Sequence, residues 1–198
     1  KKFLHQLVSS QLDMDRLGYL IRDSFFTGVV EGAVGTARII KMLNVYDDEL
    51  VVEAKGVYSI EKFLIARRMM YWQVYLHKTS VSAEQVLIKT LERAKELSRK
   101  GFRLFAAPQL EYFLKKEVTK EDFLASEEPL DYYSRFDDSD IMSAIKVWST
   151  CDDKILSLLC NNLMNRRLFK MEVRERRPAK QEENDLVKRI ADKLNISE

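Results

Sequence analysis

Residues 9–29 read SSQLDMDRLGYLIRDSFFTGV, and this stretch decides how the rest of the chain is interpreted. Four of its positions recur at the i, i+3, i+4 and i+7 spacing of a helix with one buried face: Leu17, Leu20, Ile21 and Ser24. The stretch also carries six charged or phenolic side chains: Asp13, Asp15, Arg16, Tyr19, Arg22 and Asp23. Because burying an unpaired charge is costly, these charges either pair with each other or face a cleft that holds a charged ligand.

The polar side chains fall on a face of their own. Asp15, Tyr19 and Arg22 recur at i, i+4 and i+7, with Arg16 and Asp23 along the edge of that row. In one interpretation, Asp15 pairs with Arg22 and Arg16 pairs with Asp23, so that the face is solvated and purely structural. In the other, the row lines a binding cleft. Spacing alone leaves both interpretations open.

Residues 12–29 resemble a segment of the HD-domain phosphohydrolases, in particular of their deoxynucleoside triphosphate triphosphohydrolase branch. That segment has the form L-D-x-D-R-x-D-Y-L-x-R-D-S-x-x-T-G-V, and here it reads LDMDRLGYLIRDSFFTGV. Weaker similarity follows at Glu31–Gly32, residues 38–40, residues 61–77, residues 137–140 and residues 167–170, so the resemblance spans roughly Leu4 to Lys170. It implies a mainly α-helical chain that forms part of a multi-helical HD-domain-like bundle, with a small β-hairpin or short sheet.

The resemblance also implies roles for individual residues. Asp15 would be a metal ligand of the HD site, and Arg16 would contact substrate phosphate. Tyr19 and Asp23 would lie at the sugar, where a close fit selects deoxyribose. Arg67 would reach a terminal phosphate.

A second set of candidate residues follows from spacing as well as from resemblance, which places Tyr75 near the sugar. A predicted helix over residues 58–78 carries two cations and two phenols at i, i+4, i+8 and i+11: Arg67, Tyr71, Tyr75 and Lys78. One face of this type suits a nucleoside polyphosphate, because guanidinium groups bind phosphate and phenols flank a sugar or base. The alternative is an amphipathic helix with snorkelling cations and aromatic core residues.

Metal ligands are scarce in this chain. An HD site needs two further histidines and an adjacent His-Asp pair, but His5 precedes Gln6 and His77 precedes Lys78. A divalent cation requires several convergent ligands, so Asp15 alone would not hold one. We therefore expect the other ligands of a divalent metal ion (Mn, Mg, Fe or Zn) to lie upstream. The expectation is that the chain is the C-terminal portion of a longer enzyme and is inactive alone.

Three positions depart from the family pattern. Gly18 stands where relatives commonly carry Asp; in mid-helix a glycine costs about 1 kcal/mol relative to alanine, which suggests close approach of a ligand or chain to the backbone. Gly35 stands three residues before Arg38, where nucleotide-activated relatives have Asp, and this argues against inherited nucleotide allostery. Tyr71 replaces the His of some triphosphohydrolases, and a phenol has a much higher pKa than an imidazole.

The leading functional hypothesis is that the parent protein hydrolyses deoxynucleoside triphosphates to deoxynucleoside and triphosphate, using a metal to activate water. Two alternatives stay open. The chain could be a non-catalytic module for nucleotide binding or oligomerisation, or part of an HD hydrolase that acts on another phosphorylated nucleotide.

Composition sets wider bounds. The chain has 198 residues, 46% hydrophobic and 32% charged, with a net charge of +2, and no run approaches the roughly 18 apolar residues of a membrane-spanning helix. Cys151 and Cys160 fit neither a zinc site nor a redox motif and are expected to be free thiols in a cytoplasmic protein. The basic residues around Pro178 alternate with acids, which favours a solvated linker over a nucleic-acid site. The expected partners are a nucleoside triphosphate and further copies of the chain, with no membrane.

Periodicity predicts a mostly helical chain with two candidate strands. We expect helices near residues 2–9, 12–26, 35–43, 58–78, 81–100, 108–116, 137–149, 152–165 and 181–194. The main strand candidate is residues 44–56, around a turn at Asp47-Asp48, and the second is residues 168–174, where apolar and charged residues alternate. These two segments could pair in a small sheet. The polar stretch over residues 119–131 predicts a boundary between a first domain, 1–118, and a second, 119–198.

Overall fold

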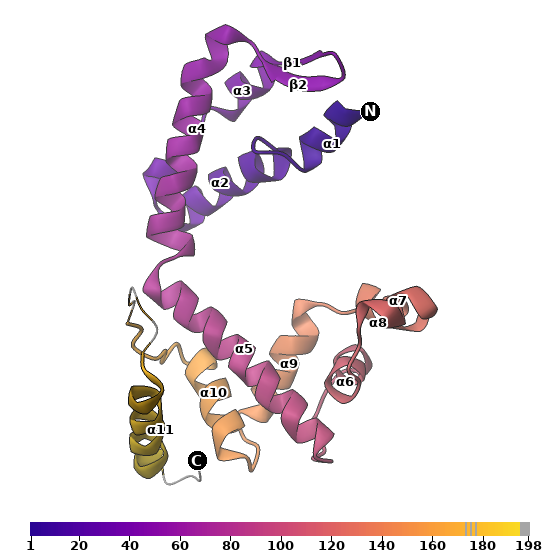
Figure 1. Ribbon diagram of the computed structural model, residues 1–198, viewed down its shortest axis with the longest axis vertical. Helices are drawn as coiled ribbons and strands as arrows, with labels where there is room; N and C mark the ends of the chain where they lie inside the picture. The colour runs from indigo at the N-terminus through magenta and orange to yellow at the C-terminus, as the bar shows by residue number, and fades with distance from the viewer. Residues whose placement is uncertain (173, 175, 177, 195–198) are drawn as a thin grey trace.

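The computed structural model describes residues 1–172, 174, 176 and 178–194. Within these residues it contains eleven α-helices and one two-stranded antiparallel sheet, which confirms the mainly α-helical prediction. Figure 1 shows two lobes joined where α4 gives way to α5. We call residues 1–76 the N-terminal lobe and residues 78–194 the C-terminal lobe. None of the described helices combines the length and the apolar character needed to cross a membrane.

Four helices and a hairpin form the N-terminal lobe. The helices are α1 (Lys2–Val8), α2 (Met14–Thr27), α3 (Thr36–Met42) and α4 (Val57–Met70), with short 3₁₀ turns η1 (Val30–Gly32) and η2 (Ala54–Gly56). A π-helical turn, η3 (Tyr71–Tyr75), extends α4. The fully buried side chains come from α2, α3 and α4: Leu17, Leu20, Ile39, Phe63 and Met70.

The hairpin consists of β1 (Leu43–Tyr46) and β2 (Glu49–Val52), paired in register from Leu43 opposite Val52 to Tyr46 opposite Glu49. Asp47 and Asp48 connect the strands with φ angles of 50° and 58°. Two successive left-handed residues form the type of turn whose twist matches a hairpin, and Asp tolerates that conformation better than most residues. The strand candidate and the turn predicted within residues 44–56 are therefore confirmed, and the segment pairs with itself as a hairpin.

Seven helices form the C-terminal lobe: α5 (Lys78–Arg99), α6 (Pro108–Lys115), α7 (Lys120–Ala125), α8 (Glu128–Ser134), α9 (Asp138–Trp148), α10 (Lys154–Met164) and α11 (Lys180–Leu194). The long helix α5 packs along α10, and α9 packs against α10. Their buried residues form a second hydrophobic cluster: Ala94, Leu97, Leu110, Leu114, Ala144, Ile145, Trp148, Leu156 and Cys160. This cluster draws residues from both sides of position 118, and the domain boundary at 118/119 stays a prediction.

One prediction about local structure is wrong, and two helices were not predicted. The strand expected over residues 168–174 is absent from the described part of that segment, and Val173 lies outside the described residues; β1 pairs with β2 instead. The polar stretch over residues 119–131 is largely helical, as α7 and the start of α8. A capping box explains α7, because Thr119 and Asp122 satisfy each other's backbone N–H groups at the start of the helix.

Candidate functional site

The helix α2 begins and ends at well-defined caps. The Asp13 carboxylate accepts a hydrogen bond of 2.7 Å from the Arg16 N–H at its start, and Gly28 at its end has φ of 72°, a conformation that favours glycine. Leu17, Leu20 and Ser24 are buried as predicted, whereas Ile21 is exposed. The buried face fixes the rotation of α2 and so determines where its polar residues point.

Three tyrosines and one carboxylate meet between α2 and the end of α4, and we call Tyr19, Asp23, Tyr71 and Tyr75 the tyrosine cluster. The Tyr75 hydroxyl donates a hydrogen bond of 2.7 Å to the Asp23 carboxylate. The Tyr75 ring contacts the rings of Tyr19 and Tyr71 edge to face, with centroids 5.9 and 5.3 Å apart. Residues separated by about fifty positions in sequence are thus brought together at one point.

The π-helical turn η3 positions the phenols of α4. Leu76 N–H donates to the Tyr71 carbonyl at 2.8 Å, a bond across five residues where an α-helix bonds across four. The wider turn rotates Tyr75 relative to the regular α-helical positions of Arg67 and Tyr71. Turns of this type recur at functional sites.

The hydroxyl groups of Tyr75 and Tyr19 both resist ionisation. Burial raises the pKa of Tyr75, and the hydrogen bond to the Asp23 carboxylate raises it further. Burial also raises the pKa of Tyr19, with the neighbouring Tyr71 as the next contribution. At neutral pH both side chains therefore stay protonated. The Tyr75 hydroxyl donates its hydrogen to Asp23, whereas the Tyr19 hydroxyl can donate a hydrogen bond to a ligand oxygen.

Two arginines flank the tyrosine cluster, and they differ in their partners. The Arg67 guanidinium lies 5.7 Å from the centre of the Tyr71 ring and donates to the Gln11 side-chain oxygen at 3.1 Å. Arg16 donates to the Ser10 carbonyl at 2.6 Å and lies 3.4 Å from the Asp13 carboxylate. Because Arg67 contacts no carboxylate among the described residues, it is the freer of the two cations for an anionic ligand.

The ion pairs that spacing allowed along α2 do not form. Arg16 pairs with Asp13, and the Arg22 side chain lies 3.9 Å from the neighbouring Asp23. Asp15 is exposed and has no hydrogen-bond or ion-pair partner within the described ranges. The first turn of α2 explains this outcome. Asp13 is the N-cap residue, and its carboxylate contacts Arg16 three residues later in the chain.

A metal site is not assembled from the described side chains. No three or more His, Cys, Asp or Glu residues gather there in a way that could hold a metal ion. Asp15 alone does not fit a divalent cation, which needs several convergent oxygen or nitrogen ligands.

Lys78 does not share a face with the other candidates. The helix predicted over residues 58–78 ends at η3, Leu76 leaves helical geometry, and His77 adopts an extended conformation with ψ of 136°. The His77 ring nitrogen accepts a hydrogen bond from the Thr79 N–H at 3.3 Å and caps α5, so Lys78 is the first residue of a new helix. The sequence did not predict this break between the two helices, because no Gly or Pro lies there.

Sequence reasoning missed two residues beside the cluster. Gln11, which contacts Arg67, precedes α2 and carried no periodic signal. Asp13 was counted among the charges but not as a cap, although an Asp before a helical run is a common helix start. Gly18 is exposed, and a Cβ built there would have no neighbour within 4 Å among the described atoms.

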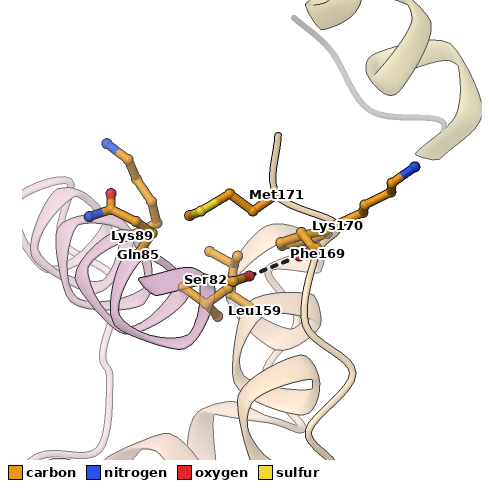
Figure 2. A pocket seen from close by; sticks show the side chains of 8 residues that line it. Ser82, Gln85, Lys89, Leu159, Phe169, Lys170 and Met171 are labelled. Carbon is orange, nitrogen blue, oxygen red and sulfur yellow. Dashed lines mark hydrogen bonds between the residues drawn. The ribbon is translucent and has the colours of Figure 1, made fainter. Parts of the chain in front are cut away.

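A separate hollow lies in the C-terminal lobe, away from the tyrosine cluster (Figure 2). It has a volume of about 250 Å³ and lies between α5, α10 and residues 169–171. Ser82 lies inside α5 and donates a hydrogen bond of 2.9 Å to the Phe169 carbonyl. The floor is apolar, and Lys89 and Gln85 stand at one rim.

Comparisons with known proteins agree with this architecture. Residues 34–120 match the family model described as the HD associated region. A crystal structure of a phosphohydrolase from Bacteroides thetaiotaomicron VPI-5482 is 54% identical and superposes with a TM-score of 0.93 over 99% of this chain. The uncharacterized protein YwfO of Bacillus subtilis (strain 168) is 37% identical over 164 residues, which is 82% of this chain. A hypothetical protein from Aquifex aeolicus, 24% identical with a TM-score of 0.61, shares the fold.

The chain spans only part of these relatives. It covers 49% of the Bacteroides chain and 36% of the Bacillus protein. Together, the family match and the Bacteroides structure support a relation to the HD-domain phosphohydrolases.

Proposed function

We propose, from this relation to the HD-domain phosphohydrolases, that the chain is the nucleotide-binding part of a metal-dependent hydrolase. The proposed substrate is a deoxynucleoside triphosphate, and the proposed products are the deoxynucleoside and triphosphate. The activity belongs to the longer protein of which this chain is the C-terminal part. In it, Asp15 supplies one ligand of a divalent cation and the other ligands come from polypeptide outside this chain.

The observation that carries the proposal is the meeting of the tyrosine cluster with Arg67. The bond between Tyr75 and Asp23 holds a phenol and a carboxylate in a fixed relation, as a site that discriminates among sugars requires. A fixed, closely packed wall of aromatic rings favours a sugar without a 2′-hydroxyl, because an added hydroxyl would have to displace a ring or lose its hydration.

Phosphate binding is assigned to Arg67 and Arg16. Arg67 is half-buried beside Tyr71, and its contact with the neutral Gln11 amide leaves its charge uncompensated. A guanidinium in this setting forms two-pronged hydrogen bonds with phosphate oxygens. Arg16 already neutralises Asp13, so we assign it the smaller share of phosphate affinity.

A non-catalytic nucleotide-binding module is the second candidate. The lack of a metal-binding group among the described residues favours it for this chain taken alone. The two candidates predict the same nucleotide affinity and differ only in turnover by the longer protein.

The test compares Arg67→Ala with Arg68→Ala in the longer protein. Arg68 is the neighbouring exposed arginine and forms no side-chain hydrogen bond or ion pair within the described ranges, so it controls for loss of charge. Loss of a charge-assisted contact weakens binding by about tenfold to a hundredfold, measured by titration calorimetry with a deoxynucleoside triphosphate. Arg68→Ala should leave affinity unchanged.

Turnover is followed by ion-exchange chromatography of the products. Release of triphosphate supports the proposed reaction, whereas release of inorganic phosphate or pyrophosphate contradicts it. Binding without any turnover by the longer protein assigns the chain to the non-catalytic module. Equal effects of the two arginine substitutions would contradict the proposed phosphate site.

A further inference from the structure

We infer that Gln11 is a positioning residue of the proposed phosphate site. Its neutral side-chain amide orients the Arg67 guanidinium and leaves the positive charge of that group available to a phosphate chain. The inference rests on the proposed function and extends it to a residue outside α2 and α4, to which neither spacing nor family resemblance assigned a role.

The turn between α1 and α2, residues 9–13, holds both arginines that flank the tyrosine cluster. Arg16 of α2 donates a hydrogen bond of 2.6 Å to the Ser10 carbonyl, and Arg67 of α4 donates one of 3.1 Å to the Gln11 side-chain oxygen. Two guanidinium groups from different helices therefore bind neighbouring residues of one turn. This turn is the point at which the two cations come together.

The backbone on both sides of Gln11 is fixed by other contacts. Towards α1, the Gln6 side-chain oxygen accepts a hydrogen bond of 2.7 Å from the Leu50 N–H of β2. Towards α2, Leu12 packs against the hydrophobic cluster of the N-terminal lobe, and the buried Asp13 caps the helix. Because its neighbours are held in this way, the Gln11 amide projects from a backbone of defined position, as a positioning residue requires.

Arg67 is held from a second direction by Tyr71. The guanidinium lies 5.7 Å from the centre of the Tyr71 ring, while the Gln11 side-chain oxygen accepts a hydrogen bond from its Nη1 at 3.1 Å. An aromatic face and an amide oxygen attract a guanidinium without cancelling its charge, whereas a carboxylate cancels it. Arg16 shows the other case, because its guanidinium lies 3.4 Å from the Asp13 carboxylate.

An amide suits this task better than either of two simple replacements. A guanidinium has five N–H groups, and the bond to Gln11 uses one of them, so the others stay available to phosphate oxygens. Gln11→Glu keeps the acceptor, but its carboxylate pairs with Arg67 and repels phosphate. Gln11→Ala removes the acceptor and frees the arginine side chain to adopt other rotamers, which a ligand must then restrict.

The contact between Gln11 and Arg67 contributes little to the stability of the fold. Gln11 is exposed, and water replaces an exposed hydrogen bond at small cost in free energy. An effect of Gln11 substitutions on ligand affinity is therefore separable from an effect on folding.

The experiment measures the affinity of the longer protein for inorganic triphosphate by titration calorimetry. Gln11→Glu should weaken binding by about tenfold or more, because the introduced carboxylate competes for Arg67. Gln11→Ala should weaken it by about threefold, since binding must now immobilise the arginine side chain.

Gln73→Glu is the matched control for the added charge. The exposed Gln73 lies on η3 and forms no side-chain hydrogen bond with the described residues. The same negative charge at this position, without a contact to Arg67, is screened by salt and should change the affinity for triphosphate by less than about twofold.

Thermal unfolding separates a positioning role from a structural one. Gln11→Glu should raise Tm by about 1–2 °C at low salt, because an exposed ion pair replaces a neutral hydrogen bond. This variant is then more stable and yet binds triphosphate more weakly, whereas damage to the fold would lower both quantities. In an Arg67→Ala background, Gln11→Glu should change neither Tm nor affinity, because its effect requires the guanidinium.

Two outcomes of these measurements would overturn the role of Gln11. One is an equal loss of affinity in Gln11→Glu and Gln73→Glu, which would reduce the effect to added charge. The other is a loss in Gln11→Glu that persists in the Arg67→Ala background, which would show that position 11 acts through another group.

A deoxynucleoside triphosphate, titrated in parallel, keeps this test separate from the test of the proposed function. If the nucleotide binds and is hydrolysed while the Gln11 variants behave like the wild type, the positioning role is wrong and the proposed function stands. If the Gln11 variants lose triphosphate affinity as expected but the nucleotide neither binds nor reacts, the positioning role stands and the proposed substrate is wrong. A wild type that binds neither ligand contradicts both.

Discussion

The two tryptophans of this chain mark the difference between its lobes. Trp148 in the C-terminal lobe is fully buried, and its indole N–H donates to the Phe105 carbonyl at 2.8 Å. Trp72, within η3 of the N-terminal lobe, is 69% exposed. One aromatic ring completes a core, and the other lies on the surface beside the tyrosine cluster.

The same contrast holds for charged groups. In the C-terminal lobe, Arg93 and Asp153 form a two-pronged ion pair with contacts of 3.2 and 2.6 Å. In the N-terminal lobe, Asp15 has no partner in the described part of the chain, and Arg67 contacts the neutral Gln11 amide and the Tyr71 ring but no carboxylate among the described residues. Groups that satisfy each other stabilise a fold, whereas groups left without a partner remain available to a ligand.

The largest expected effect on the free energy of unfolding concerns the two tryptophans. Trp148→Ala should lower the free energy of unfolding by about 3–5 kcal/mol, because it leaves a cavity in the core and removes the bond to Phe105. Trp72→Ala should change it by less than about 0.5 kcal/mol. Urea unfolding followed by circular dichroism measures both. Similar losses from the two substitutions would contradict the contrast between the lobes.

The next prediction concerns the ion pair. Asp153→Asn should lower the free energy of unfolding at pH 7 by about 2 kcal/mol, since Asn can still cap α10 but loses the charge that faces Arg93. The hydrogen bonds from Arg93 hold the pKa of Asp153 below its ordinary value. Its contribution is therefore complete above the unfolded-state pKa of about 3.9 and is lost as pH falls through that value toward the folded-state pKa.

Urea unfolding between pH 7 and pH 2.5 checks this dependence. The difference between wild type and Asp153→Asn should shrink below about pH 4. Asp152→Asn is the matched control, because the exposed Asp152 side chain forms no hydrogen bond with the described residues. If the difference in unfolding free energy between the wild type and Asp153→Asn stays constant with pH, the stabilising effect of Asp153 does not depend on its charge.

A smaller effect on stability is expected at the tyrosine cluster. Tyr75→Phe removes the hydrogen bond to Asp23 and should cost about 1 kcal/mol, yet it should weaken deoxynucleotide binding by about tenfold. Tyr58→Phe, at a tyrosine that is 83% exposed, should change neither quantity. Chemical unfolding and calorimetric titration give the two measurements. A loss of stability with no change in affinity would make the bond purely structural.

The smallest effect is expected at Gly18. Gly18→Ala should stabilise the chain by about 0.5–1 kcal/mol, because alanine favours the interior of a helix and the added Cβ meets no described neighbour. If a nucleotide approaches the backbone there, the same substitution weakens its binding to the longer protein. Gly35→Ala, which precedes α3 and also meets no neighbour, is the control. Unchanged affinity would contradict close approach at position 18.

Much of the helical architecture follows from patterns in the sequence. The buried positions Leu17 and Leu20 and the Asp47-Asp48 turn were predictable, because each depends on neighbours a few residues away. The alternation of residues 168–174 was misleading, since alternation alone does not form a strand without a partner strand, and in the described part of this segment the Phe169 carbonyl accepts a hydrogen bond from Ser82 of α5.

For the candidate site, the sequence identified the residues but not their contacts. Arg16, Tyr19, Asp23, Arg67, Tyr71 and Tyr75 do gather around one point, while their roles toward a nucleotide stay predictions. Lys78 was placed wrongly, because the end of η3 and the cap at His77 depend on how the two lobes pack and not on a helix-breaking residue.

The sequence by itself determined the helical class, the hairpin turn and the identity of the polar residues on α2 and α4, since these follow from local spacing and side-chain chemistry. Only the tertiary structure decided that Tyr75 binds Asp23, that Arg16 turns to Asp13 and that Asp15 and Arg67 keep their charges uncompensated. Such pairings depend on which helices meet and at what rotation, and that is set by the burial of side chains far apart in the chain.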